Sequence, residues 1–339
     1  MMRLLYCLLF LPMFGIAQSF NLVPLTSGVS TSIRGMSVIS DKVAWVSGSN
    51  GSVGKTLDGG NTWSWTKPQG FEKLDFRDIE AFDANRAIIV NAGSPAYILL
   101  TVDGGKNWKQ TYKNLDSAIF LDGMDFWDEN NGIIFGDPIK NKMQLLRTTD
   151  GGNSWKNISS NLKANLAIGE AGFAASGSTV EVQGKGKVWV ATGGSVSNIY
   201  TSNNYGDTWE VYKCPIIQGE SSTGPFSMAF LDKKQGVVVG GNYLKDNENL
   251  NNIWFTSNGG KSWLKPQRPV EGYRSGVVYV SQKVLLATGS SGTDLTTDGG
   301  VHWYNISKLN FNVIQKSKTG KLLLVAGNKG QIYKLVQAN

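Results

Sequence analysis

Short apolar runs that end in glycine recur along the chain and are separated by polar turns. The first occupies residues 43–48, and each run is four to seven residues long and rich in aliphatic side chains. Runs of this length and composition are typical of strands buried between stacked sheets. The pattern predicts seven repeated β units. Their apolar runs end at Gly48, Gly93, Gly136, Gly193, Gly240, Gly289 and Gly327.

A second pattern, Ser/Thr-x-Asp/Asn-x-Gly-x-x-Trp, follows six of the seven runs, and we call it the box. Successive box tryptophans lie 45, 47, 54, 54 and 40 residues apart, a period that suits a four-stranded propeller blade. The Asp or Asn can accept hydrogen bonds from its own turn, and the Trp can pack between neighbouring sheets. We therefore expect structural roles for these residues, which are Asp58 and Trp63, Asp103 and Trp108, Asp150 and Trp155, Asn204 and Trp209, Asn258 and Trp263, and Asp298 and Trp303.

The two ends of the chain supply the material to close a ring. The last apolar run, residues 322–327, is followed by one more apolar segment but by no box. Residues 20–25 read as a strand that precedes the first unit, and pairing them with the C-terminal strand would remove two open sheet edges. The sequence thus predicts an all-β fold, a seven-bladed β-propeller that forms a single domain over residues 18–339, closed by its N- and C-terminal strands.

The box is similar to the Asp-box, or BNR repeat, of sialidases, sortilin-type receptors and many secreted bacterial propellers. Over about residues 30–337 the longer unit, exemplified by residues 48–63, most resembles photosystem II stability/assembly factor-like exported propellers. This resemblance implies a propeller that serves as an assembly factor, although other Asp-box propellers are enzymes or receptors. Some bacterial relatives carry the label oxidoreductase, but the sequence has neither a GxGxxG motif between a strand and a helix nor a CxxCH motif. We expect no cofactor and no metal.

Residues 1–17 have the features of a signal peptide. Arg3 precedes an apolar stretch, residues 4–16, and small residues lead to a cleavage site between Ala17 and Gln18. A stretch of about 13 residues is too short to span a bilayer. The sequence therefore predicts export to the periplasm or to the outside, without a membrane span.

Charge and the rarer residue types narrow the function. The 33 Lys and Arg against 26 Asp and Glu give a net charge of +7, which is mild for 339 residues, and nucleic-acid binding is not expected. The single histidine, His302, lies inside the sixth box, so a zinc site with several histidines cannot be built. Of the two cysteines, Cys7 falls within the predicted signal peptide and leaves Cys214 without a disulfide partner. We expect a monomer.

The start of each innermost strand should line one mouth of the central channel. Aligning the repeats places Arg34, Arg77 and Arg274 there on blades one, two and six, with Asp122 and Glu170 on blades three and four. Converging guanidinium groups would make a receptor for an acidic ligand. In the alternative, each arginine pairs with a neighbouring carboxylate or faces solvent, and the sequence leaves both open. The candidate neighbours are Asp75, Asp78 and Glu271.

Three insertions lengthen the repeat in blades three to five. They are predicted to lie on the face opposite the boxes, which we call the loop face, and they cover residues 157–169, 213–224 and 240–252. Because loops can vary without disturbing the core, this face is the expected binding surface. Further candidate residues on it are Asp137, Tyr243 and Tyr273.

Two classes of function remain. The first is an exported non-catalytic propeller that binds a protein or peptide partner of the cell envelope through its loop face and channel mouth, as an assembly or stability factor. The alternative is a glycan-acting hydrolase of the sialidase-like propeller type, in which two of Asp122, Asp137 and Glu170 would lie about 5–10 Å apart around the substrate. The first class is favoured because the sequence shows no defined acid–base pair.

Overall fold

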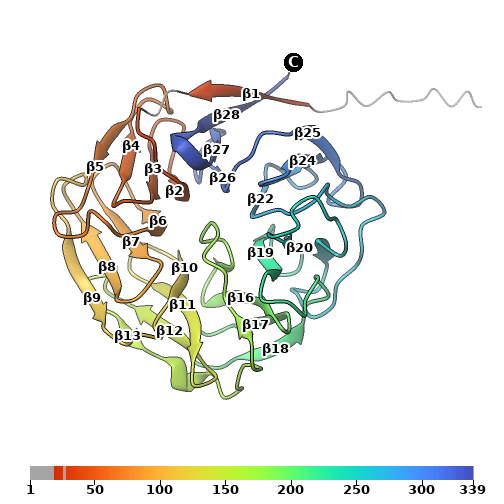
Figure 1. Ribbon diagram of the computed structural model, residues 1–339, viewed down its shortest axis with the longest axis horizontal. Coiled ribbons are helices and arrows are strands. Elements are labelled where there is room, and N and C mark those ends of the chain that lie inside the picture. Colours follow the sequence, from red (N-terminus) through yellow and green to blue (C-terminus); the bar gives the residue numbers. More distant parts are fainter. Residues whose placement is uncertain (1–18, 26–27, 339) are drawn as a thin grey trace, which may run out of the picture.

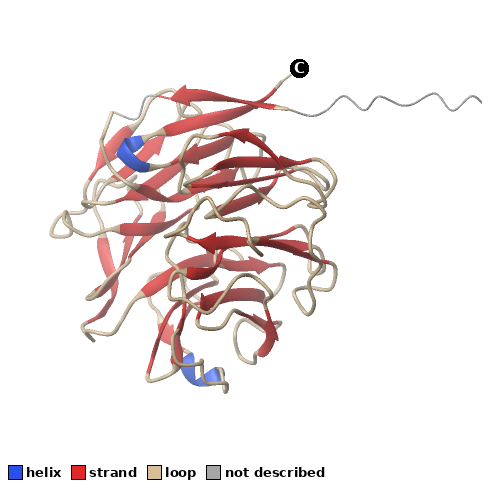
Figure 2. Cartoon of the chain, turned by 45° about the vertical axis from the view of Figure 1, so that its right-hand side comes forward, coloured by secondary structure: helices blue, strands red, loops and turns tan. Residues whose placement is uncertain are grey.

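Seven antiparallel β-sheets form a ring in the computed structural model, which describes residues 19–25 and 28–338 (Figure 1). Each sheet is one blade, and its first strand lies nearest the centre of the ring. Regular structure is almost entirely strand, with two short 3-10 turns, η1 (Ser159–Asn161) and η2 (Asn328–Gly330) (Figure 2). The predicted all-β, seven-bladed fold is confirmed. The predicted signal peptide, residues 1–17, lies outside the described residues.

Blades 1 to 3 each contain four strands in chain order. Blade 1 consists of β2 (Ile33–Val38), β3 (Ala44–Gly48), β4 (Val53–Thr56) and β5 (Ser64–Thr66). Blade 2 consists of β6 (Phe76–Ala81), β7 (Ala87–Asn91), β8 (Ala96–Thr101) and β9 (Lys109–Asn114). Blade 3 consists of β10 (Leu121–Phe126), β11 (Gly132–Ile139), β12 (Lys142–Thr148) and β13 (Lys156–Asn157).

Blades 4 to 6 depart from this plan in two places. In blade 4 the innermost position is divided between β14 (Glu170–Ala171) and β15 (Val180–Gln183), followed by β16 (Lys187–Gly194), β17 (Asn198–Ser202) and β18 (Glu210–Lys213). Blade 5 has β19 (Thr223–Phe230), β20 (Gly236–Asn242) and β21 (Ile253–Thr256), and a single bridge between Phe255 and Leu264 stands for its outer strand. Blade 6 consists of β22 (Gly276–Tyr279), β23 (Leu285–Gly289), β24 (Gly292–Thr296) and β25 (Tyr304–Ser307).

Blade 7 takes its outermost strand from the other end of the chain. Its inner strands are β26 (Val313–Lys316), β27 (Leu323–Ala326) and β28 (Ile332–Gln337). Strand β1 (Phe20–Leu25) pairs antiparallel with β28, from Phe20 opposite Gln337 to Leu25 opposite Ile332 (Figure 1). The predicted closure by residues 20–25 is confirmed, and the ring is held by backbone hydrogen bonds between its two ends.

The apolar core is divided among the spaces between blades. Seven clusters of buried side chains each join two neighbouring blades. In six of them the box Trp of one blade packs against the preceding blade, as Trp155 of blade 3 does beside Ile88 of blade 2. The cluster between blades 6 and 7 has Phe311 and Tyr333 instead, edge to face with ring centroids 5.2 Å apart. Flat aromatic side chains thus fill the wedge-shaped gaps between twisted sheets.

The six boxes form the same hydrogen-bonded turn. In the first, Thr62 N donates to Asp58 Oδ1 at 2.9 Å, and the corresponding bond occurs in every other box. These hydrogen bonds lower the pKa of Asp58 to about 2. In the sixth box the His302 imidazole lies 2.7 Å from Asp298 Oδ2, where the first box uses the Thr62 hydroxyl. His302 therefore completes a turn.

A loop crosses the centre of the ring between β14 and β15. We call residues 172–179 the plug loop, and Figure 1 shows it in green inside the circle of innermost strands. Ser176 Oγ donates to Ser275 O at 2.6 Å beside β22, and Met228 N on β19 donates to Ser178 O at 2.9 Å. The loop separates two hollows, one on the loop face and one on the face of the boxes. The repeat pattern did not predict it.

The insertion at residues 157–169 does not lie wholly on the loop face, which corrects the prediction. Asn161 Nδ2 donates to Gly206 O in the box of blade 4 at 3.1 Å. Farther along, Leu166 N donates to Asn141 O at 3.0 Å, in the hairpin between β11 and β12 on the loop face. Because β13 has only two residues, the segment that follows it must cover the height of the blade.

Among the described residues, no helix is long and apolar enough to cross a membrane.

Candidate functional site

Beta-bulges aim four side chains of the innermost strands into the channel. The register with the second strand shifts at Arg34 on β2, Arg77 on β6, Asp122 on β10 and Phe226 on β19. The extra residue of a bulge is left out of the ladder and its side chain is redirected. The alignment of the repeats placed Arg34, Arg77 and Asp122 at equivalent positions because the bulge itself is repeated from blade to blade.

Three of the glycines that end the apolar runs, Gly48, Gly136 and Gly240, lie beside these bulges, whereas Asn91 takes this place in blade 2. At Gly48 a Cβ atom would overlap Ser32 O, and at Gly136 it would overlap Phe120 O. The glycines are required by the close approach of two backbones, since a side chain would push the innermost strand away. In these three blades the run-ending glycine and the bulged side chain belong to the same stretch of strand pairing.

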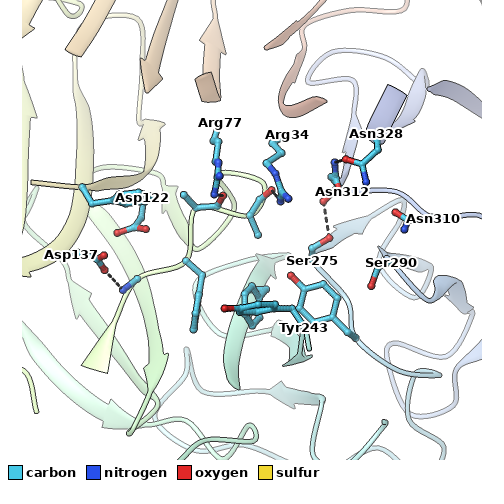
Figure 3. Close-up of a pocket in the computed structure, with 17 residues that line it drawn as sticks. Arg34, Arg77, Asp122, Asp137, Tyr243, Ser275, Ser290, Asn310, Asn312 and Asn328 are labelled. Atoms are coloured by element: carbon cyan, nitrogen blue, oxygen red, sulfur yellow. Dashed lines mark hydrogen bonds between the residues drawn. The ribbon is translucent and has the colours of Figure 1, made fainter. Parts of the chain in front are cut away.

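These side chains open into a hollow of about 520 Å³ on the loop face, which we call the upper pocket (Figure 3). Arg34 and Arg77 extend from adjacent blades on one side of it, and Asp122 lies beside Arg77. Serine and asparagine side chains from blades 6 and 7 form the wall next to Arg34, where Asn312 Nδ2 donates to Ile33 O at 2.9 Å. The first half of the plug loop completes the lining. The pocket volume falls within the range of small-ligand sites, about 300–1,000 Å³.

The two arginines differ in how they are neutralised. Arg77 Nε donates to Asp75 Oδ2 at 2.8 Å in a half-exposed ion pair. Arg34 Nη1 donates to Ala175 O of the plug loop at 3.2 Å, and no carboxylate of the described chain lies within ion-pair distance of it. Burial and the positive charge of Arg77 both lower the pKa of Arg34. An incoming anion would relieve this repulsion.

Two carboxyl groups of blade 3, those of Asp122 and Asp137, line the pocket on the side of Arg77. Asp122 is 1% exposed, and its Oδ2 has no hydrogen-bond partner within the described chain. Burial, followed by the neighbouring charge of Asp137, raises the pKa of Asp122 well above its usual value. Asp137 accepts a hydrogen bond from Gly172 N at 2.8 Å, and burial raises its pKa as well. A carboxyl group that retains its proton can donate a hydrogen bond to a ligand.

Aromatic rings form the third part of the lining. Phe173 of the plug loop stacks on Phe226 with centroids 4.1 Å apart, and Tyr273 and Tyr243 meet Phe226 edge-on at 4.8 and 6.0 Å. Tyr243 is 47% exposed at the rim, whereas Tyr273 is buried. The pocket thus offers an apolar surface next to its guanidinium groups.

Two residues predicted at the channel mouth lie elsewhere. Glu170 is buried inside blade 4, where its Oε1 accepts hydrogen bonds from Asn198 Nδ2 and Tyr200 OH, both at 2.8 Å. Arg274 is fully buried in blade 6, and its Nε donates to Asp294 Oδ2 at 2.6 Å. Neither strand start is bulged, so neither side chain is turned toward the pocket. The predicted residues that do line it are Arg34, Arg77, Asp122, Asp137, Tyr243 and Tyr273.

The plug loop and the position of Phe173 in the pocket were not predicted from the sequence. The only signal was a run of small residues, Gly-Phe-Ala-Ala-Ser-Gly-Ser-Thr, in place of an alternating strand at residues 172–179. Within the described part of the chain, no cluster of three or more His, Cys, Asp or Glu side chains is arranged to hold a metal ion.

One protein-family model matches part of the chain. Residues 18–117, which include β1 and blades 1 and 2, match the model of the family described as photosynthesis system II assembly factor YCF48. The predicted resemblance to these propellers is confirmed. Among curated proteins, no sequence matches the chain.

Solved structures of similar shape extend the likeness over the whole ring. One described as YCF48 bound to D1 peptide has a TM-score of 0.67 at 18% identity and covers 94% of this chain and 97% of its own. YCF48 from Cyanidioschyzon merolae has a TM-score of 0.65 at 18% identity, with 93% and 98% covered. A GH74 xyloglucanase from Xanthomonas campestris has a TM-score of 0.59 at 14% identity, with 93% of this chain and 53% of its own covered. At such identities the likeness establishes the fold alone.

Proposed function

We propose that this chain is an exported, non-catalytic propeller that binds a protein or peptide segment in the upper pocket and on the surrounding loop face, as an assembly or stability factor. The observation that carries the proposal is the placement of Arg34 and Arg77, from adjacent blades, beside an aromatic surface in an open pocket. The structure of YCF48 with a D1 peptide, which shares the fold, supports a peptide as the class of ligand.

The pocket suits a segment that carries an acidic group next to an apolar side chain. Arg34 makes one hydrogen bond to a plug-loop carbonyl and has free donors for a carboxylate. Hydrogen bonds between a guanidinium and a carboxylate are about twice as strong as neutral ones. A neighbouring apolar side chain would pack on Phe226 and Tyr243, which adds buried area. The ligand class is therefore an acidic peptide segment.

The proposed setting is the cell envelope. It rests on the signal-peptide features of residues 1–17, and the partner would then be an envelope protein exposed to the periplasm or the outside. The family description as a photosystem II assembly factor and the structure of YCF48 with a D1 peptide supply the analogy for the role.

The glycan-acting hydrolase has less support. Asp122 and Asp137 both belong to blade 3 and lie on the same side of the pocket (Figure 3), whereas the carboxyl groups of a glycosidase flank the bond that they cleave. Glu170, the third predicted carboxyl group, is held inside its blade. The GH74 xyloglucanase shares only the fold.

Peptide selection followed by calorimetry tests the proposal. The immobilised protein would select from a random peptide library, and the affinity of the best peptide would be measured with wild-type protein and with the Arg34→Ala and Arg77→Ala variants. We expect acidic residues to be enriched and each variant to bind about 10- to 150-fold more weakly, because each loses a charge-assisted hydrogen bond of about 1.5–3 kcal/mol. The thermal midpoints should stay close to that of the wild type.

The matched control is Arg268→Ala, which removes an exposed guanidinium that does not line the upper pocket. It should leave the peptide affinity unchanged. Selected peptides without acidic residues, or wild-type affinity in both pocket variants, would refute the proposed role of the arginines.

A further inference from the structure

A second hollow lies on the box side of the plug loop. We call it the lower cavity; its volume is about 610 Å³, and residues 176–178 of the plug loop separate it from the upper pocket. Four carboxyl groups from three consecutive blades line it: Asp78 and Glu80 on β6, Asp125 on β10 and Glu181 on β15. The peptide-binding role proposed above does not use them.

Three of these carboxyl groups tie each blade to the next. Each accepts a hydrogen bond from a backbone N–H on the innermost strand of the following blade. The bonds run from Met124 N to Asp78 Oδ2 at 2.6 Å, from Val182 N to Asp125 Oδ2 at 2.7 Å and from Phe230 N to Glu181 Oε1 at 2.9 Å.

Serines make the same connection in the blades on either side. Ala81 N donates to Ser37 Oγ at 3.2 Å, and Val277 N donates to Ser227 Oγ at 3.0 Å. A hydroxyl thus satisfies this N–H without the free-energy cost of burying a carboxylate. The second oxygen of Asp78 and of Asp125 accepts a hydrogen bond from the next backbone N–H of its own strand, that of Ile79 and of Phe126. The connection between blades therefore uses one oxygen of each of these two carboxyl groups.

The same cavity contains an unsatisfied hydroxyl and, at one end, an ammonium group that is already paired with a carboxylate. Ser317 is 3% exposed, and its Oγ has no hydrogen-bond partner within the described chain, although nearly all buried polar groups are paired. Lys318, from the turn between β26 and β27, forms an ion pair with Glu80 across the neighbouring blade. One end of the cavity is therefore already arranged around an alkylammonium group.

The spacing of the carboxyl groups favours an extended cation over a single ion. No three potential ligands of the described chain are close enough to share a metal, since the carboxyl groups are spread over blades 2 to 4. Apolar side chains line the cavity as well, including Met36, Met124 and Met228. A flexible chain with ammonium groups separated by methylenes matches both features, and the volume suits a ligand of that size.

We propose that the lower cavity binds a linear polyamine. Its ammonium groups lie against Asp78, Asp125 and Glu181, its methylenes lie along the methionines, and the Ser317 hydroxyl accepts a hydrogen bond from it. The site is separate from the upper pocket, so the polyamine proposal and the peptide proposal can be tested, and refuted, independently of each other.

Proton release is the expected signature of this binding. Burial raises the pKa of Asp125 to about 7 and raises those of Asp78 and Glu181 well above their usual values. An ammonium ligand favours the ionised carboxylates, so binding expels protons and the affinity rises with pH between 6 and 8. The other titratable groups that face the cavity are Glu80, Tyr279, Lys316 and Lys318.

Titration calorimetry of the full chain with spermidine, in several buffers at pH 6.5 and 8, tests the proposal. Glu181→Gln keeps an acceptor for Phe230 N–H, and Asp125→Ser reproduces the serine connection of blade 1, so both variants are expected to fold. Each should bind spermidine about tenfold more weakly than the wild type, as the loss of a charge-assisted contact predicts. The wild type should release protons on binding.

The control Glu129→Gln removes an exposed carboxylate outside the cavity and should bind as the wild type does. Thermal unfolding of each variant shows whether it is folded. The proposal is overturned if spermidine does not bind, if the folded Glu181→Gln and Asp125→Ser variants both bind like the wild type, or if Glu129→Gln weakens binding equally. Tighter binding of a lysine-containing peptide than of spermidine would also overturn it, because the cavity would then serve a protein partner.

Discussion

Arginines at equivalent positions of the ring have different roles, since some line the upper pocket and one is buried inside its blade. Arg34 and Arg77 sit on bulges and extend into the upper pocket, whereas Arg274 has no exposed side-chain surface. Arg274 forms an ion pair with Asp294, and its Nη2 also donates to Glu271 O at 2.7 Å. A guanidinium so fully paired belongs to the scaffold of blade 6. Of the two alternatives that the sequence left open, Arg274 thus follows the second: it pairs with a carboxylate of the chain, that of Asp294.

At this scale we predict that Arg274→Ala lowers the free energy of unfolding by about 3–5 kcal/mol, because it leaves the Asp294 carboxylate buried without its partner. Urea unfolding followed by tryptophan fluorescence measures the change. Arg268→Ala, at an exposed and loosely paired guanidinium, should change stability by less than about 1 kcal/mol. A stable Arg274→Ala protein would contradict the scaffold role.

The repeating element is a blade whose box Trp packs against the preceding blade. Trp155 packs in the cluster between blades 2 and 3, edge to face with Phe126 at 6.0 Å between centroids. The Asp-box turn fixes the direction in which the chain enters the outer strand and so fixes where the Trp lies. Each box is a joint between two sheets, which is why its pattern survives while the loop lengths vary.

Trp155→Ala should therefore cost about 3–5 kcal/mol of unfolding free energy, the usual range for truncating a large side chain in a core. Chemical denaturation monitored by circular dichroism measures this loss. The control is Leu57→Ala, in the first box but 55% exposed, which should stay within about 0.5 kcal/mol of the wild type. Equal effects of the two substitutions would show that the box Trp is not a packing joint.

The whole molecule depends on the pairing of its two ends. Strand β1 covers the edge of β28 along its full length, and Phe20 belongs to the cluster between blades 6 and 7. Without β1, blade 7 would have three strands and an open edge, and such edges favour pairing with other chains.

We predict that a chain beginning at Gly28 unfolds at a lower temperature and associates at high concentration, whereas a chain beginning at Ser19 behaves as the wild type does. Scanning calorimetry and size-exclusion chromatography with light scattering would compare the two. A monomeric Gly28 variant with an unchanged thermal midpoint would mean that the terminal strand is dispensable.

Much of the fold and part of the site could be predicted from the sequence. The upper-pocket residues Arg34, Arg77 and Asp122 were found because the bulge that presents them recurs with the repeat. Arg274 was misplaced because its alignment position carries no bulge. Its buried partner, Asp294, lies on the third strand of the same blade, and a pairing of that kind has no local signature.

The sequence by itself determined the number of blades, the box turns and the closing strand, because each rests on short-range patterns that recur at a regular period. Only the tertiary structure decided that residues 172–179 divide the channel and that Asp78, Asp125 and Glu181 share one cavity. Those arrangements bring together single residues from different blades. Their proximity follows from the curvature of the closed ring, which no stretch of sequence contains.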